Sequence, residues 1–186
     1  MNKIFFSLIL FVSCLVGGCA DDIAEDAIKI TPGDIKKEVI KGVEILYSDS
    51  AKIRVRISGP LMYRILDSDN PSEEFTKGVH VDFFDENGNV TSTLKADYAQ
   101  RYQNKPEVLA RGNVVMTSSK KENMETDEII WDRNTEKVYT HKFVMVKTPK
   151  ETFWGQGFES NQDFTQWHIN GLEGHINSDK FENGIK

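Results

Sequence analysis

The side chains best suited to metal or acid–base chemistry are spread thinly along the chain. The four histidines are His80, His141, His168 and His175. None stands two residues from another, the spacing that would place two imidazoles on one face of a strand, and no cysteine lies near enough to join them as a ligand. We therefore expect ordinary surface or cross-strand histidines, with no bound metal and no other cofactor.

Neither the carboxylates nor the glycine-rich segment predicts an active site. Several carboxylates fall at the ends of expected strands and in turns, where turn formation explains them better than a general acid–base pair does; they are Asp82, Asp85, Asp97, Asp127 and Asp132. Gly155-Gln156-Gly157 is too short for a phosphate-binding loop, and no helix pattern follows it. The chain also has no Gly-x-Ser-x-Gly nucleophile motif. The sequence thus predicts that the protein is not an enzyme.

Cys19 is the residue with the clearest chemical role. Lys3 precedes a mostly apolar run, residues 4–16, that leads into Gly17-Gly18-Cys19. A positive charge, a short hydrophobic stretch and then small residues are typical of a cleaved secretion signal, and about thirteen apolar residues are fewer than a membrane-spanning helix needs. Residues 15–19 resemble the bacterial lipobox. We therefore expect cleavage after residue 18 and acylation of the Cys19 sulfur, with Cys14 the poorer alternative acceptor.

Composition limits what the mature chain can bind. Both cysteines lie at the amino-terminal end, so the body of the protein can form no disulfide. Loss of residues 1–18 shortens the chain from 186 to 168 residues and removes Lys3, which leaves 22 basic against 29 acidic residues and a net charge of −7. Such a surface has no electrostatic footprint for nucleic acid. It also does not attract anionic lipid broadly, so attachment to a membrane depends on the acyl chains at Cys19.

The elements that follow are expected to be strands. Beyond residue 42 the chain alternates apolar and polar residues, the pattern of half-buried strands. We expect Gly59-Pro60 to end one such run, because proline cannot donate a ladder hydrogen bond. Asp85-Glu86-Asn87-Gly88 predicts a hairpin turn between a strand near 79–84 and a strand that starts at Val90. No segment has a helical period with caps. The expected fold is therefore all-β, a single antiparallel twisted β-jellyroll or β-roll with open ends.

This reading divides the chain into four parts. Residues 1–18 are the cleaved lipoprotein signal peptide, and residues 19–42 are a polar, flexible tether with Pro32-Gly33 in its middle. Residues 43–178 form the β-jellyroll domain, and residues 179–186 are a carboxy-terminal tail. The tether would let the roll stand away from the membrane that holds Cys19.

Alternation also predicts which side chains face the interior of the roll. The expected inward residues are Val79, Val81, Phe83, Leu94, Ala96, Tyr98, Val108, Val114, Met116, Val138, Val144, Val146 and Phe153. An error of one residue in a strand would turn its whole apolar set to the other face. The sequence leaves open whether this interior is a ligand-binding groove or a packed core.

The order of short motifs between about residues 47 and 176 resembles LptC, the periplasmic component of the lipopolysaccharide export machine, which is related to the OstA-like bridge proteins. The motifs are residues 47–50 (YSDS), 78–85 (GVHVDFFD) with Asn87-Gly88, 96–99 (ADYA), 111–116 (RGNVVM), 126–132 (TDEIIWD), 144–149 (VMVKTP) and 153–158 (FWGQGF). Each motif is weak by itself, and their order along the chain makes the resemblance specific.

The resemblance implies a lipid carrier. Such a roll accepts lipopolysaccharide from the permease subunits of an inner-membrane ABC transporter, holds the lipid A acyl chains among its inward residues, and joins a periplasmic OstA-like bridge protein by β-strand augmentation. Better-known members are held by an uncleaved transmembrane helix, whereas here a lipobox stands in its place, which implies a lipid anchor on the periplasmic face of the inner membrane.

Two other functions remain open from the sequence. One is a surface-exposed lipoprotein, at the outer membrane or cell surface, that binds glycan or protein. The other is a glycolipid chaperone that works without a transporter.

Overall fold

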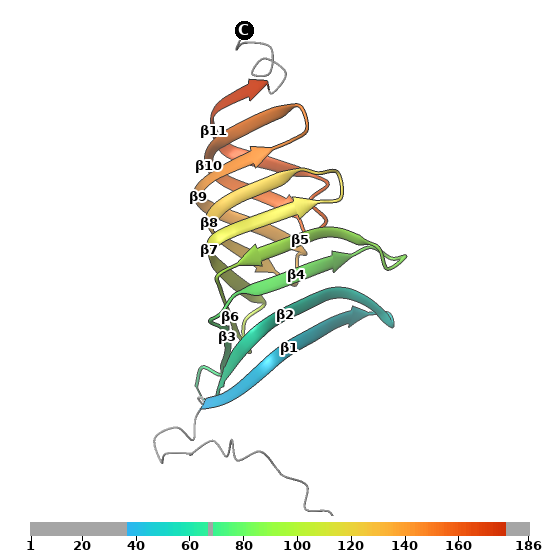
Figure 1. Cartoon of the computed structure of the whole chain (residues 1–186), viewed down its shortest axis with the longest axis vertical. Coiled ribbons are helices and arrows are strands. Elements are labelled where there is room, and N and C mark those ends of the chain that lie inside the picture. Colours follow the sequence, from blue (N-terminus) through green and yellow to red (C-terminus); the bar gives the residue numbers. More distant parts are fainter. Residues whose placement is uncertain (1–36, 67–68, 178–186) are drawn as a thin grey trace, which may run out of the picture. The chain divides into compact units, whose positions relative to one another are not determined.

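The computed structural model describes residues 37–66 and 69–177, which belong to one compact unit, Gly33–Lys186 (Figure 1). These residues form strands and no helix, and therefore no helix that could span a membrane. All pairings are antiparallel and join the strands into a single sheet, so the predicted all-β fold is confirmed. The strands are β1 Lys37–Asp49, β2 Lys52–Ile65, β3 Ser72–Phe75, β4 Val79–Phe84, β5 Val90–Ala96, β6 Tyr98–Tyr102, β7 Glu107–Ser118, β8 Asn123–Asp132, β9 Lys137–Lys147, β10 Glu151–Asn161 and β11 Trp167–Asn177.

The boundary expected between the tether and the roll, at residues 42 and 43, falls inside β1. This strand begins at Lys37, so residues 37–41, assigned to the tether, are paired with residues 61–65 of β2. Val43 is the buried residue of β1. The signal peptide, Cys19, the rest of the tether and the carboxy-terminal tail lie outside the described residues.

Two long strands bend, and the bends turn the single sheet into two facing walls. Residues 55–58 of β2 pair with β4, whereas residues 62–65 pair with β3. In the same way, residues 115–118 of β7 pair with β5, whereas residues 108–111 pair with β6. The sheet therefore has a β4–β5 wall and a β3–β6 wall, and the longer strands after β6 pass from one wall to the other.

Gly59-Pro60 lies at the bend of β2 and does not end the strand, which corrects the expectation from the sequence. The strand continues because its neighbour changes from β4 to β3 at this point. The bend also requires glycine, since a Cβ at residue 59 would lie 2.6 Å from Cδ1 of Phe75 and 2.9 Å from the carbonyl oxygen of Gly78. Proline is tolerated because residue 60 has no partner in the registers of β2 with β1, β3 and β4, so the missing amide removes no ladder hydrogen bond.

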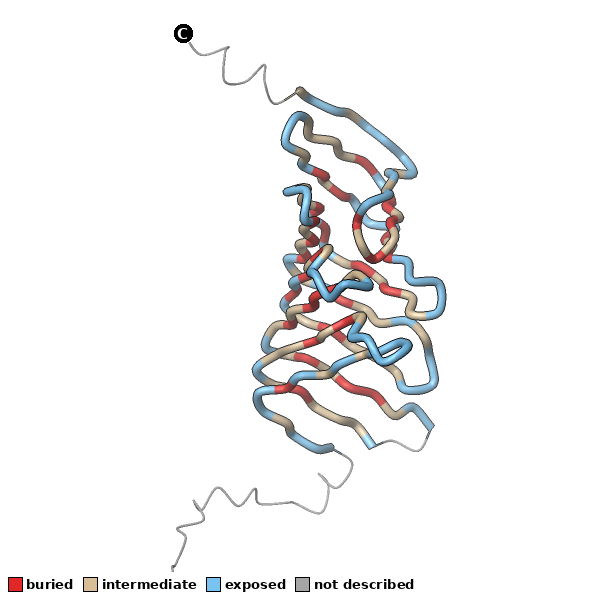
Figure 2. Tube along the Cα trace, turned by 90° about the vertical axis from the view of Figure 1, so that its right-hand side faces the viewer, coloured by how far each residue is buried: buried red, intermediate tan, exposed pale blue. Residues whose placement is uncertain are grey.

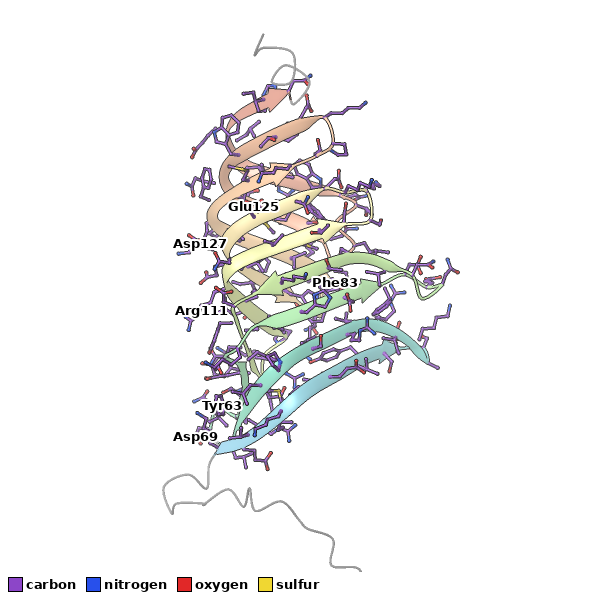
Figure 3. The ribbon with its side chains drawn as sticks, in the orientation of Figure 1. Tyr63, Asp69, Phe83, Arg111, Glu125 and Asp127 are labelled. Atoms are coloured by element: carbon purple, nitrogen blue, oxygen red, sulfur yellow. The ribbon has the colours of Figure 1, made fainter. Side chains whose placement is uncertain are left out.

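Irregular pairing marks the bends of the later strands. The register shifts between Arg111 and Val114 of β7, and again between residues 126 and 130 of β8. Arg111 and Asp127 lie along the left-hand margin of the molecule in Figure 3, where these strands turn. Gly112 supports the turn with a φ of +78°, which costs glycine little. Bulges of this kind bend a strand and re-aim its side chains.

The core lies between the two walls, and a loop closes it along one side. Figure 2 shows buried positions alternating with more exposed ones along most strands. In the loop between β10 and β11, the carbonyl of Gln162 accepts a hydrogen bond from Ser92 on β5, and its amide donates to the carbonyl of Glu136 in the β8–β9 turn. The loop thereby spans the two walls, and the fully buried Phe164 fills the space beneath it.

Among the described strands, β1 and β11 each have one edge without a paired neighbour. Within the described residues β1 pairs with β2 alone and β11 pairs with β10 alone. The outer backbone groups of both strands are therefore available for a further strand.

Candidate functional site: an apolar cavity between the walls

A narrow cavity lies between the walls beneath β1. Apolar side chains from each of the strands β1 to β8 line it, and they include Ile45, Ile57, Phe75, Val81, Leu94, Ala99, Val108 and Ile129. The free space is about 30 Å³, which is close to the share of one water molecule in the liquid. The interior is therefore nearly filled in this conformation, and a longer ligand enters only if the walls move apart.

Most of the expected inward residues are buried, and they fall into two groups. Val79, Val81, Phe83, Leu94 and Val108 line the cavity. Val114, Met116, Val138, Val144 and Val146 are fully or almost fully buried in the core farther along the roll, and Ala96 is also buried. Phe153 is partly buried near the last strand, where its ring packs edge-on to Trp167 and stacks on His175. The two groups form one continuous apolar interior.

Tyr98 does not share the inward face of Leu94 and Ala96, which corrects that part of the expectation. β5 ends at Ala96, and Asp97 separates it from β6, so the alternation restarts and Ala99 is the buried residue. Tyr98 lies under the guanidinium of Arg111, whose Cζ is 4.3 Å from the ring centroid. Partial burial in this contact raises the pKa of the Tyr98 hydroxyl.

Sequence reasoning missed the aromatic residues that meet across the cavity. Trp131 on β8 lies edge-on to Phe83 on the opposite wall, with ring centroids 5.5 Å apart, and edge-on to Tyr47 on β1 at 5.9 Å. Figure 3 locates Phe83 on β4. The alternation of Ile129 and Trp131 was a usable signal for an inward face of β8. No signal in the sequence pairs Tyr47 with Trp131.

A polar network closes the cavity at Tyr47. Arg101 on β6 donates a hydrogen bond to the Tyr47 hydroxyl and forms an ion pair with the buried Glu73 at 2.5 Å. Arg64 forms a second ion pair with Glu73, with its Nε 3.4 Å from Oε1 of the carboxylate. Arg133 lies 5.8 Å from the Tyr47 ring. Tyr47 thus ties β1, which pairs only with β2 among the described strands, to the β3–β6 wall.

A second charged cluster lies on the outer face of β4, away from the cavity. The buried Asp82 accepts hydrogen bonds from Arg56 at 2.7 and 2.9 Å and contacts Nε2 of His80 at 2.8 Å. Burial raises the pKa of Asp82, but the hydrogen bonds from Arg56 and His80 outweigh it, so the pKa lies below its ordinary value. This carboxylate is therefore held charged by its partners, which is a structural role.

The described residues form no cluster that could bind a metal ion. Residues 37–66 and 69–177 bring no three His, Cys, Asp or Glu side chains together in a way that could hold a metal ion. The arrangement suits the holding of an apolar group between two walls.

One comparison with known proteins matches most of this roll. The model of a family described as lipopolysaccharide-assembly, LptC-related, matches residues 39–171. The matched range includes the whole cavity and extends from β1 into β11. A search of curated proteins found no match.

Proposed function

Because the chain belongs to the LptC-related family of lipopolysaccharide-assembly proteins, we propose that it is a carrier in lipopolysaccharide transport. It accepts lipopolysaccharide from an inner-membrane ABC transporter and passes it to the periplasmic bridge that leads to the outer membrane. The observation that carries this proposal is the continuous apolar interior between the two walls. The proposal requires no catalytic residue, because ATP hydrolysis by the transporter supplies the energy.

The interior suits acyl chains for a simple physical reason. Each methylene removed from water contributes about 0.8 kcal/mol, so acyl chains cannot cross an aqueous compartment uncovered. Residues from Val79 to Val146 supply a buried apolar path. The small free volume of about 30 Å³ means that loading requires the walls to separate. β1 is the element to move, since among the described strands it pairs with β2 alone, and the Tyr47 side chain links it to the opposite wall.

The free edges of the sheet suit a chain of similar rolls. An exposed strand edge is normally protected because it invites pairing with other chains. Here β11 ends the strand order on one side, and β1, which is joined to β2, lies at the other end of the roll (Figure 1). One edge would meet the transporter permease and the other would pair with the OstA-like bridge protein by β-strand augmentation.

Attachment to the membrane is the remaining part of the proposal. Acylation of Cys19 would hold the protein on the periplasmic face of the inner membrane, next to the transporter. The residues between Cys19 and Lys37 would then connect the anchor to β1, the strand that moves on loading.

In vivo photo-crosslinking tests the carrier function. A photo-reactive residue at Phe83 or Val144, both inside the roll, should capture lipopolysaccharide, and capture should require ATP turnover by the transporter. The matched control is Lys95, an exposed residue between the buried Leu94 and Ala96, where little capture is expected. A roll that captures no glycolipid from either inward position contradicts the carrier function.

A further inference from the structure

Trp131 carries a polar atom that the rest of the fold does not use. Its side chain is 6% exposed, and its indole Nε1 has no hydrogen-bond partner. Within the described residues one other buried side-chain atom shares this condition, Nδ1 of His80 on the outer face. A buried donor without an acceptor is costly, and native proteins retain few of them. Phenylalanine would fill most of the same space without that cost.

The unpartnered indole belongs to a side chain that lines the cavity. Trp131 lies among apolar residues there, with Tyr47 and Phe83 edge-on to its ring. The polar side chains at the cavity already have partners: Gln100 donates to Glu74 and to Tyr102, and Arg101 pairs with Glu73. A water molecule beside the indole would find few of the two to four partners that a buried water needs.

We propose that Trp131 Nε1 anchors one neutral oxygen of the acyl portion of the bound glycolipid, a carbonyl of an ester or amide link or a hydroxyl on the chain. This inference rests on the proposed carrier function and adds the group that the cavity recognises. The donor is uncharged and its surroundings are apolar, so a neutral acceptor flanked by hydrocarbon fits better than a phosphate. Among the described residues that line the cavity, the cation is Arg101, which is already paired with Glu73, so a phosphate would have to leave water without a lining cation to receive it.

The position of Tyr47 links the entry of acyl chains into the cavity to the exposure of the Trp131 indole. Its ring packs against Trp131 and its hydroxyl is bonded to Arg101. Displacement of β1 therefore enlarges the cavity and uncovers the indole in one movement. Acyl chains would enter beside Trp131, and the anchored oxygen would fix how deeply they lie.

Nitrogen-15 spectra of the full chain, labelled at tryptophan, test this inference. The three tryptophans should give three indole signals, and the signal lost in Trp131→Phe belongs to residue 131. If that variant does not fold, Trp154→Phe and Trp167→Phe assign it by elimination. Lipid A and methyl dodecanoate should shift the indole proton of Trp131 downfield, whereas tridecane, which has as many carbon atoms as methyl dodecanoate but no ester, should not.

Affinity supplies the second measurement. Trp131→Phe should bind lipid A about three- to tenfold more weakly, the loss of one neutral hydrogen bond, and should bind tridecane as the native protein does. Trp154→Phe is the matched control, since Trp154 packs on Gly174 away from the cavity.

Two results would overturn the inference and leave the carrier function standing. One is that Trp131→Phe binds lipid A as tightly as the native protein does. The other is that lipid A does not shift the Trp131 signal, because a water molecule already accepts the indole hydrogen bond. Failure of the native protein to bind lipid A at all would overturn both.

Discussion

Replacement of Phe164 by alanine should remove the plug that closes the interior beneath the β10–β11 loop. The ring of Phe164 is fully buried and packs edge-on to Phe158, with ring centroids 5.8 Å apart. Its centroid lies 6.4 Å from that of Trp167. Truncation of a buried phenylalanine typically lowers the free energy of unfolding by about 3–5 kcal/mol. Residue 164 has a φ of +53°, a conformation that strains alanine as much as phenylalanine, so the change reports side-chain burial and not backbone strain.

Urea denaturation followed by circular dichroism measures this effect. For an m-value of about 2 kcal/mol per molar, the midpoint should fall by about 1.5–2.5 M. Phe143→Ala is the matched control, because that ring is 44% exposed and its loss should cost about 1 kcal/mol or less. If Phe164→Ala is as stable as Phe143→Ala, the loop does not close the interior by packing, and the reasoning fails.

Three further changes have expected outcomes. Because the pKa of Asp82 is lowered in the folded protein, its contribution to stability is present above about pH 4 and is lost as the pH falls through the lowered pKa. Asp82→Asn should therefore lower the free energy of unfolding at pH 7 by about 1.5–3 kcal/mol. It should also reduce the difference between the free energies of unfolding at pH 7 and pH 3, which urea titrations at the two pH values measure. Gly155→Ala should loosen β11, since the new Cβ would lie 2.2 Å from the carbonyl oxygen of Gly171; unchanged amide exchange in β11 would contradict this. Cys19→Ala should abolish labelling by a radioactive fatty acid and release the protein from the membrane, and continued labelling would contradict the assignment of Cys19 and point to Cys14 or another acceptor.

Local patterns explain the parts of the fold that the sequence predicted. The hairpin at residues 85–88 formed as expected, because Asp85 accepts hydrogen bonds from the amides of Asn87 and Asn89 and Gly88 supplies a φ of +83°. Both features depend on residues within one turn. Burial of residues such as Val81 and Val144 follows from the period of two in a strand, which is also local.

The two expectations that were wrong, for Tyr98 and for Gly59-Pro60, concern places where the backbone changes direction. Tyr98 was assigned to the face of Ala96 by counting in twos, but Asp97 interrupts the count: its amide and carbonyl bond to Gly112 and Gly78, outside the ladder of β5. Gly59-Pro60 was expected to end a strand, and the strand instead exchanges one neighbour for another. In both places the outcome depends on which strands lie alongside, and the local sequence does not contain that information.

The sequence by itself determined the fold class and the faces of most strands, and the order of its motifs pointed to the family; the anchor at Cys19 stays a prediction. These depend on residue types and on spacing within a few positions. Only the tertiary structure decided that Tyr47 and Trp131 meet across the interior, that Phe164 fills the space under a loop, and that the cavity is nearly filled. The physical reason is that such contacts depend on the summed bends of several strands, and a small change at one bend moves every side chain beyond it.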